Sequence, residues 1–362
     1  MRGPEPGQAV MFSYVALESR IPTDHPLRAM RTLVDPILTE LSPRFTDLYA
    51  ASGRPSIPPE QLLRALLVQV LYTIRSERQL IEQLDYNLLF RWFVGLGMDE
   101  PVWHPTTFTK NRDRLVGGAI AEAFLTGVLR QAAARGLLST EHFTVDGTLL
   151  DAWASQKSFQ RRDRPGPDDD DPGNPSVRFH GERRTNATHR STTDPEARLW
   201  RTGPGKEAKL SYQASVLMDN RYGLVVGTAV DTPTGTAERD QALELLSALP
   251  PLRRRRRTVG GDQGFTTRDF VAGARTLGFT PHVAQGAHRT ILDERTTRHP
   301  GYAVSQQRRK RVEESFGWGK TIGLLRKLRH RGRATVDWIF TFTMAAYNLV
   351  RLRTLQQAGV CA

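Results

Sequence analysis

The chain has 362 residues, of which 39% are hydrophobic and 25% charged, so it can form the packed core of one large domain or two smaller ones. No apolar run is long enough for a membrane-spanning helix, and the single cysteine excludes an internal disulfide and a multi-cysteine zinc site. The formal charge of +13 is uneven, with +1 over residues 1–140, −3 over 141–250 and +15 over 251–362. Such a basic field suits a polyanion such as nucleic acid, although an arginine-rich composition alone would produce the same count.

Residues 1–139 have the pattern of an all-helical domain. The segment 57–72 opens with a proline-rich start, and its leucine and valine residues then recur at helical spacing. Ser76 is a typical N-cap for a second helix, and a further helix is predicted over 119–135.

An aromatic cluster and a short basic helix complete this part. We predict that the aromatic side chains form core rather than a base-stacking surface: Phe90, Trp92, Phe93 and Trp103. The helix near 106–114 is predicted to expose basic side chains that could contact phosphates or only solvent, among them Lys110 and Arg112.

The hydrophobic period changes at residue 142, where an α/β pattern begins. Strands are predicted over 142–150, 210–218, 224–231, 257–261 and 280–284. Helices are predicted over 237–249 and 267–277, so that helices and strands alternate after the third strand. A basic helix over 305–326 and an apolar helix over 336–355 close the chain. This order predicts that 140–362 form an RNase H-like domain, a mixed sheet flanked by helices.

A long polar insertion follows the first strand, over about 156–209. It is rich in proline and glycine and has little to bury, so we expect it to lack regular packed structure over most of its length. Its acidic run, 168–171, could resemble a metal site, but adjacent carboxylates in such a segment are usually solvated.

Two aspartates are placed where they could do chemistry on nucleic acid. Asp146 lies within an otherwise apolar strand, and Asp262 follows the carboxyl end of the fourth strand. Phosphoryl transfer by two metal ions needs carboxylate ligands on rigid elements, and these two fit that need. Either aspartate could instead cap a turn.

A third carboxylate is expected from the basic helix. Taking Arg309 as zero, Glu313 falls at roughly 40° and Lys320 at roughly 20° around a regular helix, so the three form one polar stripe beside the packing face. Glu314 falls at roughly 140°, on the outward side.

Several segments resemble DDE transposases of bacterial insertion sequences, in the group called the insertion-sequence-five family. The matching segments are VDGTLLDAWASQKSF, GDQGFTTRDFV and RKRVEESFGWGK, together with TGTAERDQALELL and the N-terminal IPPEQLLRALLVQVLY. The resemblance covers nearly the whole chain, and the combination in this order is highly specific.

This resemblance implies a catalytic, metal-binding triad of Asp146, Asp262 and Glu313, holding two Mg²⁺ ions for which Mn²⁺ is a possible substitute. The family's helix signature of tyrosine, arginine, glutamate and lysine is met by Arg309, Glu313 and Lys320. Gln306 stands at the tyrosine position.

The implied partners are double-stranded DNA, as terminal inverted repeats and as target, and further copies of the chain on that DNA. We expect DNA contacts from Arg309 and Lys320, from Lys110 and Arg112, and from the basic residues that follow the helix, Arg326, Lys327 and Arg329. The expected location is the cytoplasm, with the nucleoid, and no membrane is expected as a partner. Two alternatives stay open: a non-catalytic DNA-binding protein such as a decayed transposase or repressor, and a nuclease without strand transfer.

Overall fold

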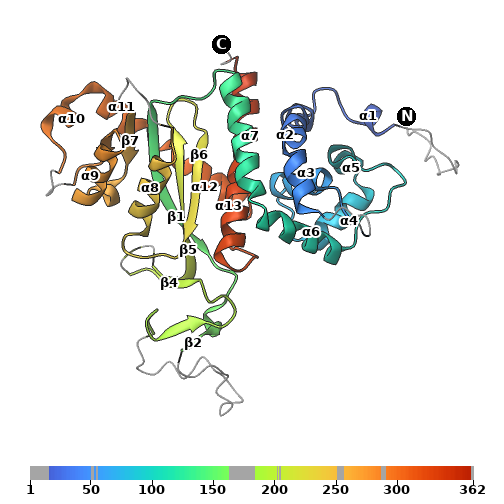
Figure 1. Ribbon diagram of the computed structural model, residues 1–362, viewed down its shortest axis with the longest axis horizontal. Helices are drawn as coiled ribbons and strands as arrows, with labels where there is room; N and C mark the ends of the chain where they lie inside the picture. Colours follow the sequence, from blue (N-terminus) through green and yellow to red (C-terminus); the bar gives the residue numbers. More distant parts are fainter. Residues whose placement is uncertain are drawn as a thin grey trace, which may run out of the picture.

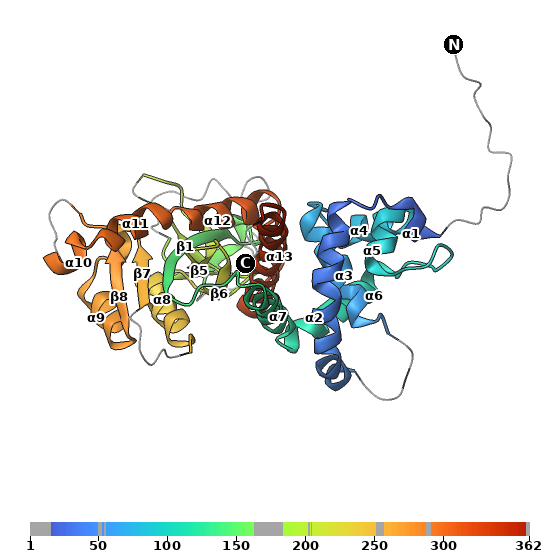
Figure 2. The same ribbon diagram turned by 90° about the horizontal axis from the view of Figure 1, so that it is seen from above.

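The chain forms a group of N-terminal helices beside a sheet that is covered by helices on both faces (Figures 1 and 2). The computed structural model describes residues 16–49, 53, 56–162, 184–201, 203, 205–250, 257–286 and 291–359. None of the described helices is long and apolar enough to cross a membrane.

The N-terminal part is helical, as predicted. Its helices are α1 (Leu17–Arg20), α2 (Pro26–Leu48), α3 (Pro59–Leu71), α4 (Glu77–Tyr86), α5 (Leu88–Val94), α6 (Pro105–Gly117) and α7 (Ile120–Ala134). Ser76 caps α4, because its hydroxyl accepts a hydrogen bond of 3.1 Å from the Gln79 backbone N–H. Gly95 ends α5 with a φ of 92°, a conformation that glycine adopts at little cost.

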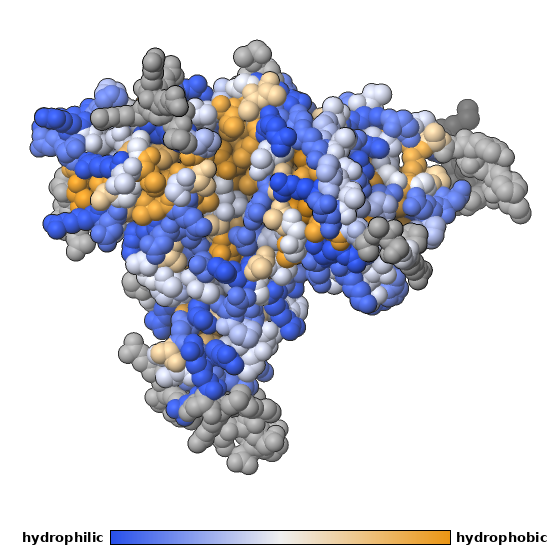
Figure 3. Space-filling model, in the orientation of Figure 1, coloured by the Kyte–Doolittle hydropathy of each residue, from blue (hydrophilic) through white to orange (hydrophobic). Residues whose placement is uncertain are grey.

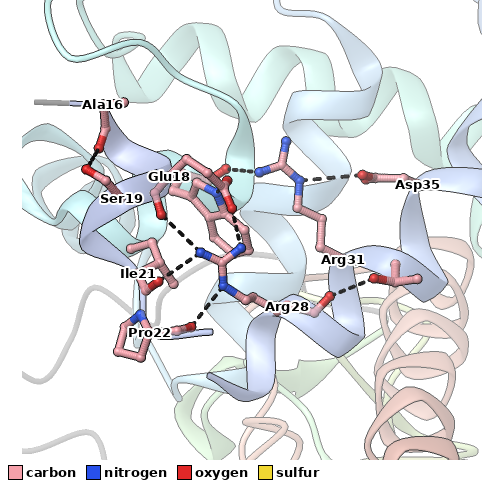
Figure 4. A network of polar contacts seen from close by, with 10 residues as sticks. Ala16, Glu18, Ser19, Ile21, Pro22, Arg28, Arg31 and Asp35 are labelled. Carbon is pink, nitrogen blue, oxygen red and sulfur yellow. Dashed lines mark hydrogen bonds and ion pairs between the residues drawn. The ribbon is translucent and has the colours of Figure 1, made fainter. Parts of the chain in front are cut away.

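The aromatic cluster forms core, which confirms the prediction. Phe90, Trp92 and Phe93 are buried, and Trp103 packs against the same core. Helix α1 is held by Arg28 of α2, whose guanidinium binds the Glu18 side chain and the backbone carbonyl groups of Ile21 and Pro22 (Figure 4).

In the described residues, six strands form one mixed sheet in the order β4-β5-β1-β7-β8, and β6 pairs with β5 as well. The strands are β1 (His142–Asp151), β4 (Arg198–Trp200), β5 (Lys209–Asp219), β6 (Val225–Asp231), β7 (Arg257–Gly261) and β8 (Phe279–Val283). The first three long strands pair antiparallel, and β1, β7 and β8 run parallel to each other. This is the RNase H-like topology that the order of elements predicted.

Helices cover the sheet on both faces (Figure 2). On one face, α8 (Ala237–Ser247) and α9 (Arg268–Thr276) pack on the side chains of Val145 and Val259. The other face is covered by α11 (Pro300–Arg308), α12 (Arg311–Thr321) and α13 (Arg333–Gln357), and the short α10 (Glu294–Arg298) precedes them. Helix α13 also packs against α7, so the core of the N-terminal helices continues into the C-terminal helix.

The described residues of the polar insertion are mostly irregular, as predicted, but they include a 3₁₀ turn (Gln156–Ser158) and three strands of three residues each. Strands β2 (Phe159–Arg161) and β3 (His189–Ser191) form a small hairpin-like sheet on a mostly hydrophilic lobe (Figure 3), and β4 joins the main sheet. Polar partners stabilise this order: Tyr212 donates a buried hydrogen bond of 2.7 Å to Asp194. The acidic run 168–171 lies outside the described residues.

The basic segment 305–326 is not one helix, which corrects the prediction. Helix α11 ends at Arg308 and α12 begins at Arg311, with a tight turn between them. The Val312 and Glu313 N–H groups bond to carbonyl oxygens only three residues back, at 3.1 and 3.2 Å. Helix α11 packs on β7 and β8, whereas α12 packs on β1 and α13.

Candidate active site

The strand register brings Asp146 and Asp262 to the same level of the sheet. Strands β1 and β7 pair parallel, with Thr144 opposite Gly260. Extending this register by two residues places Asp146 opposite Asp262. Asp146 on β1 and Asp262, directly after the end of β7, are therefore expected to lie near each other although they are distant in sequence.

Asp146 belongs to the face that α11 and α12 cover. Val145 and Val259 pack toward α8 and α9, so the alternation of strand side chains turns residues 144, 146 and 260 the other way. The neighbourhood of Gly260 confirms this direction, because a Cβ there would lie 3.2 Å from the Ser305 hydroxyl oxygen and 3.6 Å from the Arg309 Cβ atom, both on the α11 side.

Each aspartate uses one carboxylate oxygen in a local hydrogen bond. Asp146 Oδ1 accepts from the Gly147 N–H at 2.8 Å, and Asp262 Oδ1 accepts from the Gly264 N–H at 2.7 Å. Asp262 thus caps a short 3₁₀ turn, as the turn-capping alternative foresaw. Within the described residues the second oxygen of each carboxylate makes no hydrogen bond and no ion pair, which leaves it free to bind a ligand.

Several negatively charged side chains lie close enough to Asp146 to affect its ionisation. Burial raises the pKa of Asp146 to about 7, against the lowering effect of the Gly147 N–H, and the negative charges of Asp262, Glu238 and Glu313 raise it further. Burial also raises the pKa of Glu238, and the charge of Asp262 adds to that effect. Several carboxylates that hinder each other's ionisation are characteristic of a site that binds cations.

The two neighbouring glutamates of α12 have different surroundings. Both are exposed. The charge of Glu313 acts on Asp146, whereas the charge of Glu314 acts on Arg311 and Tyr347. Of the two, Glu313 is the glutamate whose charge raises the pKa of Asp146.

Two cationic side chains flank the carboxylates. Lys320 lies over β1, where its Nζ donates a hydrogen bond of 2.6 Å to the Thr148 hydroxyl oxygen. Burial lowers the pKa of Lys320. Arg309 lies beside β7, and its Nε donates to Gln306 Oε1 at 3.1 Å. Gln306, at the tyrosine position of the signature, thus orients the arginine and also bonds the His282 carbonyl oxygen.

The carboxylates fit a hard divalent cation in their chemistry. Oxygen ligands of this kind suit Mg²⁺ and Mn²⁺. In the described part of the chain, however, no three His, Cys, Asp or Glu side chains converge closely enough to hold a metal ion as they stand. Binding a metal ion would therefore require the side chains of Asp146, Asp262 and Glu313 to move closer together.

The other basic residues that were predicted to contact DNA differ in their exposure to solvent. Arg326 and Lys327 are exposed, and Arg329 is partly buried beside a cavity between α3 and α13. Lys110 is exposed. The prediction that Arg112 is exposed is wrong.

Arg112 is only 8% exposed, because it forms a buried ion pair with Glu77 of α4 and a second ion pair of 2.6 Å with Asp113. Its guanidinium joins α4 to α6 and is not available to a phosphate.

One carboxylate that affects the site is absent from the sequence prediction: the charge of Glu238 raises the pKa of Asp146. It lies in the first turn of α8, after the third long strand. It belongs to the segment TGTAERDQALELL, where an acidic residue at a helix start looks like an ordinary partner of the helix dipole. A search of helix starts that follow sheet strands would have included it.

Two family models match the chain. Residues 15–114 match a transposase domain model, DUF772, and residues 176–349 match a transposase DDE domain model. No protein with a curated description matches.

Among solved structures, a piggyBac transposase synaptic complex with hairpin DNA is 10% identical, covering 92% of this chain and 76% of that one, with a TM-score of 0.42. A mariner Mos1 paired end complex with Mg is 16% identical, covering 86% and 81%, with a TM-score of 0.21. The Mos1 complex with Mn is 15% identical, covering 85% and 81%, with a TM-score of 0.21. Likenesses this distant assign no residues.

Proposed function

Because the chain belongs to the DDE transposases, we propose that it cuts DNA at the ends of an insertion sequence and joins the freed ends to target DNA. Asp146, Asp262 and Glu313 are the proposed catalytic residues. The observation that carries this proposal is the parallel pairing of β1 with β7, which brings the turn bearing Asp262 beside Asp146, together with the effect of the Asp262 and Glu313 charges on the pKa of Asp146.

The three carboxylates would hold two Mg²⁺ ions, with Mn²⁺ as a substitute. When bound, such ions lower the pKa of a water molecule and neutralise negative charge on the phosphate that is attacked. The chain contributes rigid placement: Asp146 comes from the middle of a paired strand, Asp262 from the turn after β7, and Glu313 from a helix that packs on β1.

Arg309 and Lys320 would bind the DNA backbone on either side of these carboxylates. The planar guanidinium of Arg309 suits a bidentate contact with a phosphate, and its hydrogen bond to Gln306 restricts its orientation. Lys320 supplies a compact charge, positioned by Thr148 two residues beyond Asp146 on the same strand.

The proposed partners are the terminal inverted repeats, the target DNA and further copies of the chain assembled on them. The division of work is also proposed: residues 140–362 carry out the chemistry, and the helical part over 1–139 recognises the repeats or mediates assembly. The exposed residues Lys110, Arg326 and Lys327 are available for phosphate contacts.

A strand-transfer assay with the flanking inverted repeats tests the function. Integration products support the transposase. Cleavage without integration would favour a nuclease, and a shifted DNA band without cleavage would favour a non-catalytic DNA-binding protein.

The pair Glu313 and Glu314 tests the residues. Glu313→Gln should abolish Mg²⁺-dependent cleavage while metal-free DNA binding and the fold persist. The matched control Glu314→Gln should retain cleavage within about tenfold, since it removes no proposed ligand. An active Glu313→Gln variant beside an inactive Glu314→Gln variant would overturn the assignment.

A further inference from the structure

A pocket of about 290 Å³ lies where α11 passes the amino-terminal ends of β1 and β7. Two of the residues that line it are His142 of β1 and Thr258 of β7, which pair in the sheet. Side chains four residues apart on a strand point to the same face, so His142 shares the face of Asp146. At about 3.3 Å per residue, the two positions are roughly 13 Å apart along β1.

One side of α11 forms a wall of this pocket. The residues that line it recur at spacings of three and four along the helix, which places them on one face: Gly301, Val304, Ser305 and Arg308. Val304 is 55% exposed, and Arg308 is exposed as well. The pocket is therefore accessible from solvent on this side.

The opposite wall is the turn after β5, which carries Arg221. This turn is held in place from two directions. The Asn220 side-chain amide donates a hydrogen bond of 3.1 Å to the Phe143 carbonyl oxygen, and Arg311 of α12 donates one of 3.0 Å to the Arg221 carbonyl oxygen. The two walls are thus fixed to the same sheet and to consecutive helices.

The charged side chains of the pocket are cationic. Among the residues that the structure describes, none forms an ion pair or a side-chain hydrogen bond with the guanidinium of Arg308. Arg221 has only a long ion pair of 3.7 Å with Glu141, and its side chain is 55% exposed. No aspartate or glutamate is found among the described residues that line the pocket. Two guanidinium groups without a close carboxylate suit an anion with several oxygen atoms, such as a phosphate.

A neutral donor lies on the same wall as Arg308. Ser305 is only 7% exposed, and its hydroxyl has no hydrogen-bond partner within the described part of the chain. A buried hydroxyl without a partner is costly, so a ligand oxygen in the pocket would remove that cost.

We propose that this pocket binds one phosphate of a DNA strand, held by Arg221 and Arg308, with the Ser305 hydroxyl as a further donor. The inference rests on the proposed function, because it concerns the DNA that reaches Asp146. Roughly 13 Å corresponds to about four nucleotides at 3.4 Å of rise each, so the bound phosphate would lie a few nucleotides from the one that is cut.

A carboxylate from a second copy of the chain is the competing occupant. Two observations favour DNA instead. The pocket lies on the face of the sheet that bears Asp146, and α11 belongs to the segment 251–362, whose formal charge is +15.

The test measures binding of the full chain to a duplex with the inverted repeat, in a chelator, with single phosphates replaced in turn by neutral methylphosphonates. In the wild type, one replacement a few nucleotides from the cleavage position should weaken binding by about tenfold or more. In the variant that carries both Arg221→Gln and Arg308→Gln, the same replacement should have no further effect, because the groups that contact this phosphate are already absent. The slope of log affinity against log salt should fall by about 0.9 in this variant.

The matched control carries Arg268→Gln and Arg275→Gln. These arginines are exposed on α9, which packs on the opposite face of the sheet, so the control removes the same charge elsewhere. It should keep both the salt slope and the methylphosphonate effect of the wild type. Circular dichroism reports whether each variant folds.

The outcomes separate the two proposals. If the methylphosphonate effect persists in the Arg221→Gln and Arg308→Gln variant, the pocket does not hold that phosphate, and the inference is refuted while strand transfer by the wild type leaves the proposed function standing. If the wild type does not bind the inverted repeat, the proposed function fails as well. If this variant binds DNA as the wild type does but sediments as a smaller assembly without DNA, the pocket binds a second copy and the inference is overturned.

Discussion

Replacing Asp146 by Asn should make the metal-free protein more stable at alkaline pH. The pKa of Asp146 is raised in the folded state from 3.8 to about 7, chiefly by burial. Between these values the unfolded chain has already released this proton, whereas the folded chain retains it. Stability is therefore present in full below the unfolded pKa and is lost as the pH rises through the folded pKa. Asparagine carries no such charge, so the variant escapes this loss.

The magnitude follows from the difference between the two pKa values. At about 1.4 kcal/mol per pH unit, ionisation of Asp146 costs the folded state at most roughly 4 kcal/mol at pH 8. Partial solvent access and relaxation reduce the expected value to about 2 kcal/mol. Other groups titrate in this range, such as Asp337, whose pKa is raised to about 6, but they are present in both proteins and cancel in the comparison.

The assay is urea unfolding of wild type and Asp146→Asn in a chelator, at several values between pH 4 and pH 8. The difference in unfolding free energy should be near zero at pH 4 and reach about 2 kcal/mol in favour of the variant at pH 8. Added Mg²⁺ should then stabilise the wild type by about 2.7 kcal/mol at a hundred times its dissociation constant, and the variant by less. A difference in unfolding free energy that does not change with pH would show that the pKa of Asp146 is not raised in the folded protein.

Three further predictions concern the rest of the chain. Arg112→Ala should destabilise the protein by about 3–5 kcal/mol, because it leaves the partly buried Glu77 with a hydrogen bond from Thr109 but no cationic partner, whereas the exposed control Lys110→Ala should stay within about 0.5 kcal/mol in the same denaturation assay. Replacing both Arg326 and Lys327 by Gln should reduce the slope of log DNA affinity against log salt by about 2, at roughly 0.9 per phosphate, and an unchanged slope would place the DNA elsewhere. Tyr212→Phe should cost about 1–3 kcal/mol by removing the buried hydrogen bond to Asp194, which thermal unfolding would detect, and a neutral effect would show that this bond does not hold the insertion in place.

The sequence by itself was sufficient for most of the elements and their order. Hydrophobic residues at periods of 3.6 and 2 reveal which face of a helix or strand is buried, and this information is local. The helix predicted over 57–72 is α3 (Pro59–Leu71), and the strand around Asp146 is β1 (His142–Asp151). Asp146 was conspicuous for the same reason, as a charge within an apolar strand.

Tertiary structure decided everything that depends on partners distant in the chain. Arginine is usually exposed, so the sequence predicts that Arg112 lies at the surface. Only the packing of α4 on α6 places the Glu77 carboxylate beside it. The polar residues of the insertion become ordered because β5 supplies hydrogen-bond partners such as Tyr212. No local pattern contains either contact.

The site shows the same division most clearly. Residue types and motifs selected Asp146, Asp262 and Glu313, but the common level of the two aspartates follows from the pairing of strands that are more than a hundred residues apart. The turn after Arg308 and the approach of Glu238 to Gly147 follow from how helices pack on a twisted sheet. Periodicity in the sequence indicates which residues are buried. Which of them contact each other depends on the sheet, because strands pair and helices pack only where the whole fold brings their segments together.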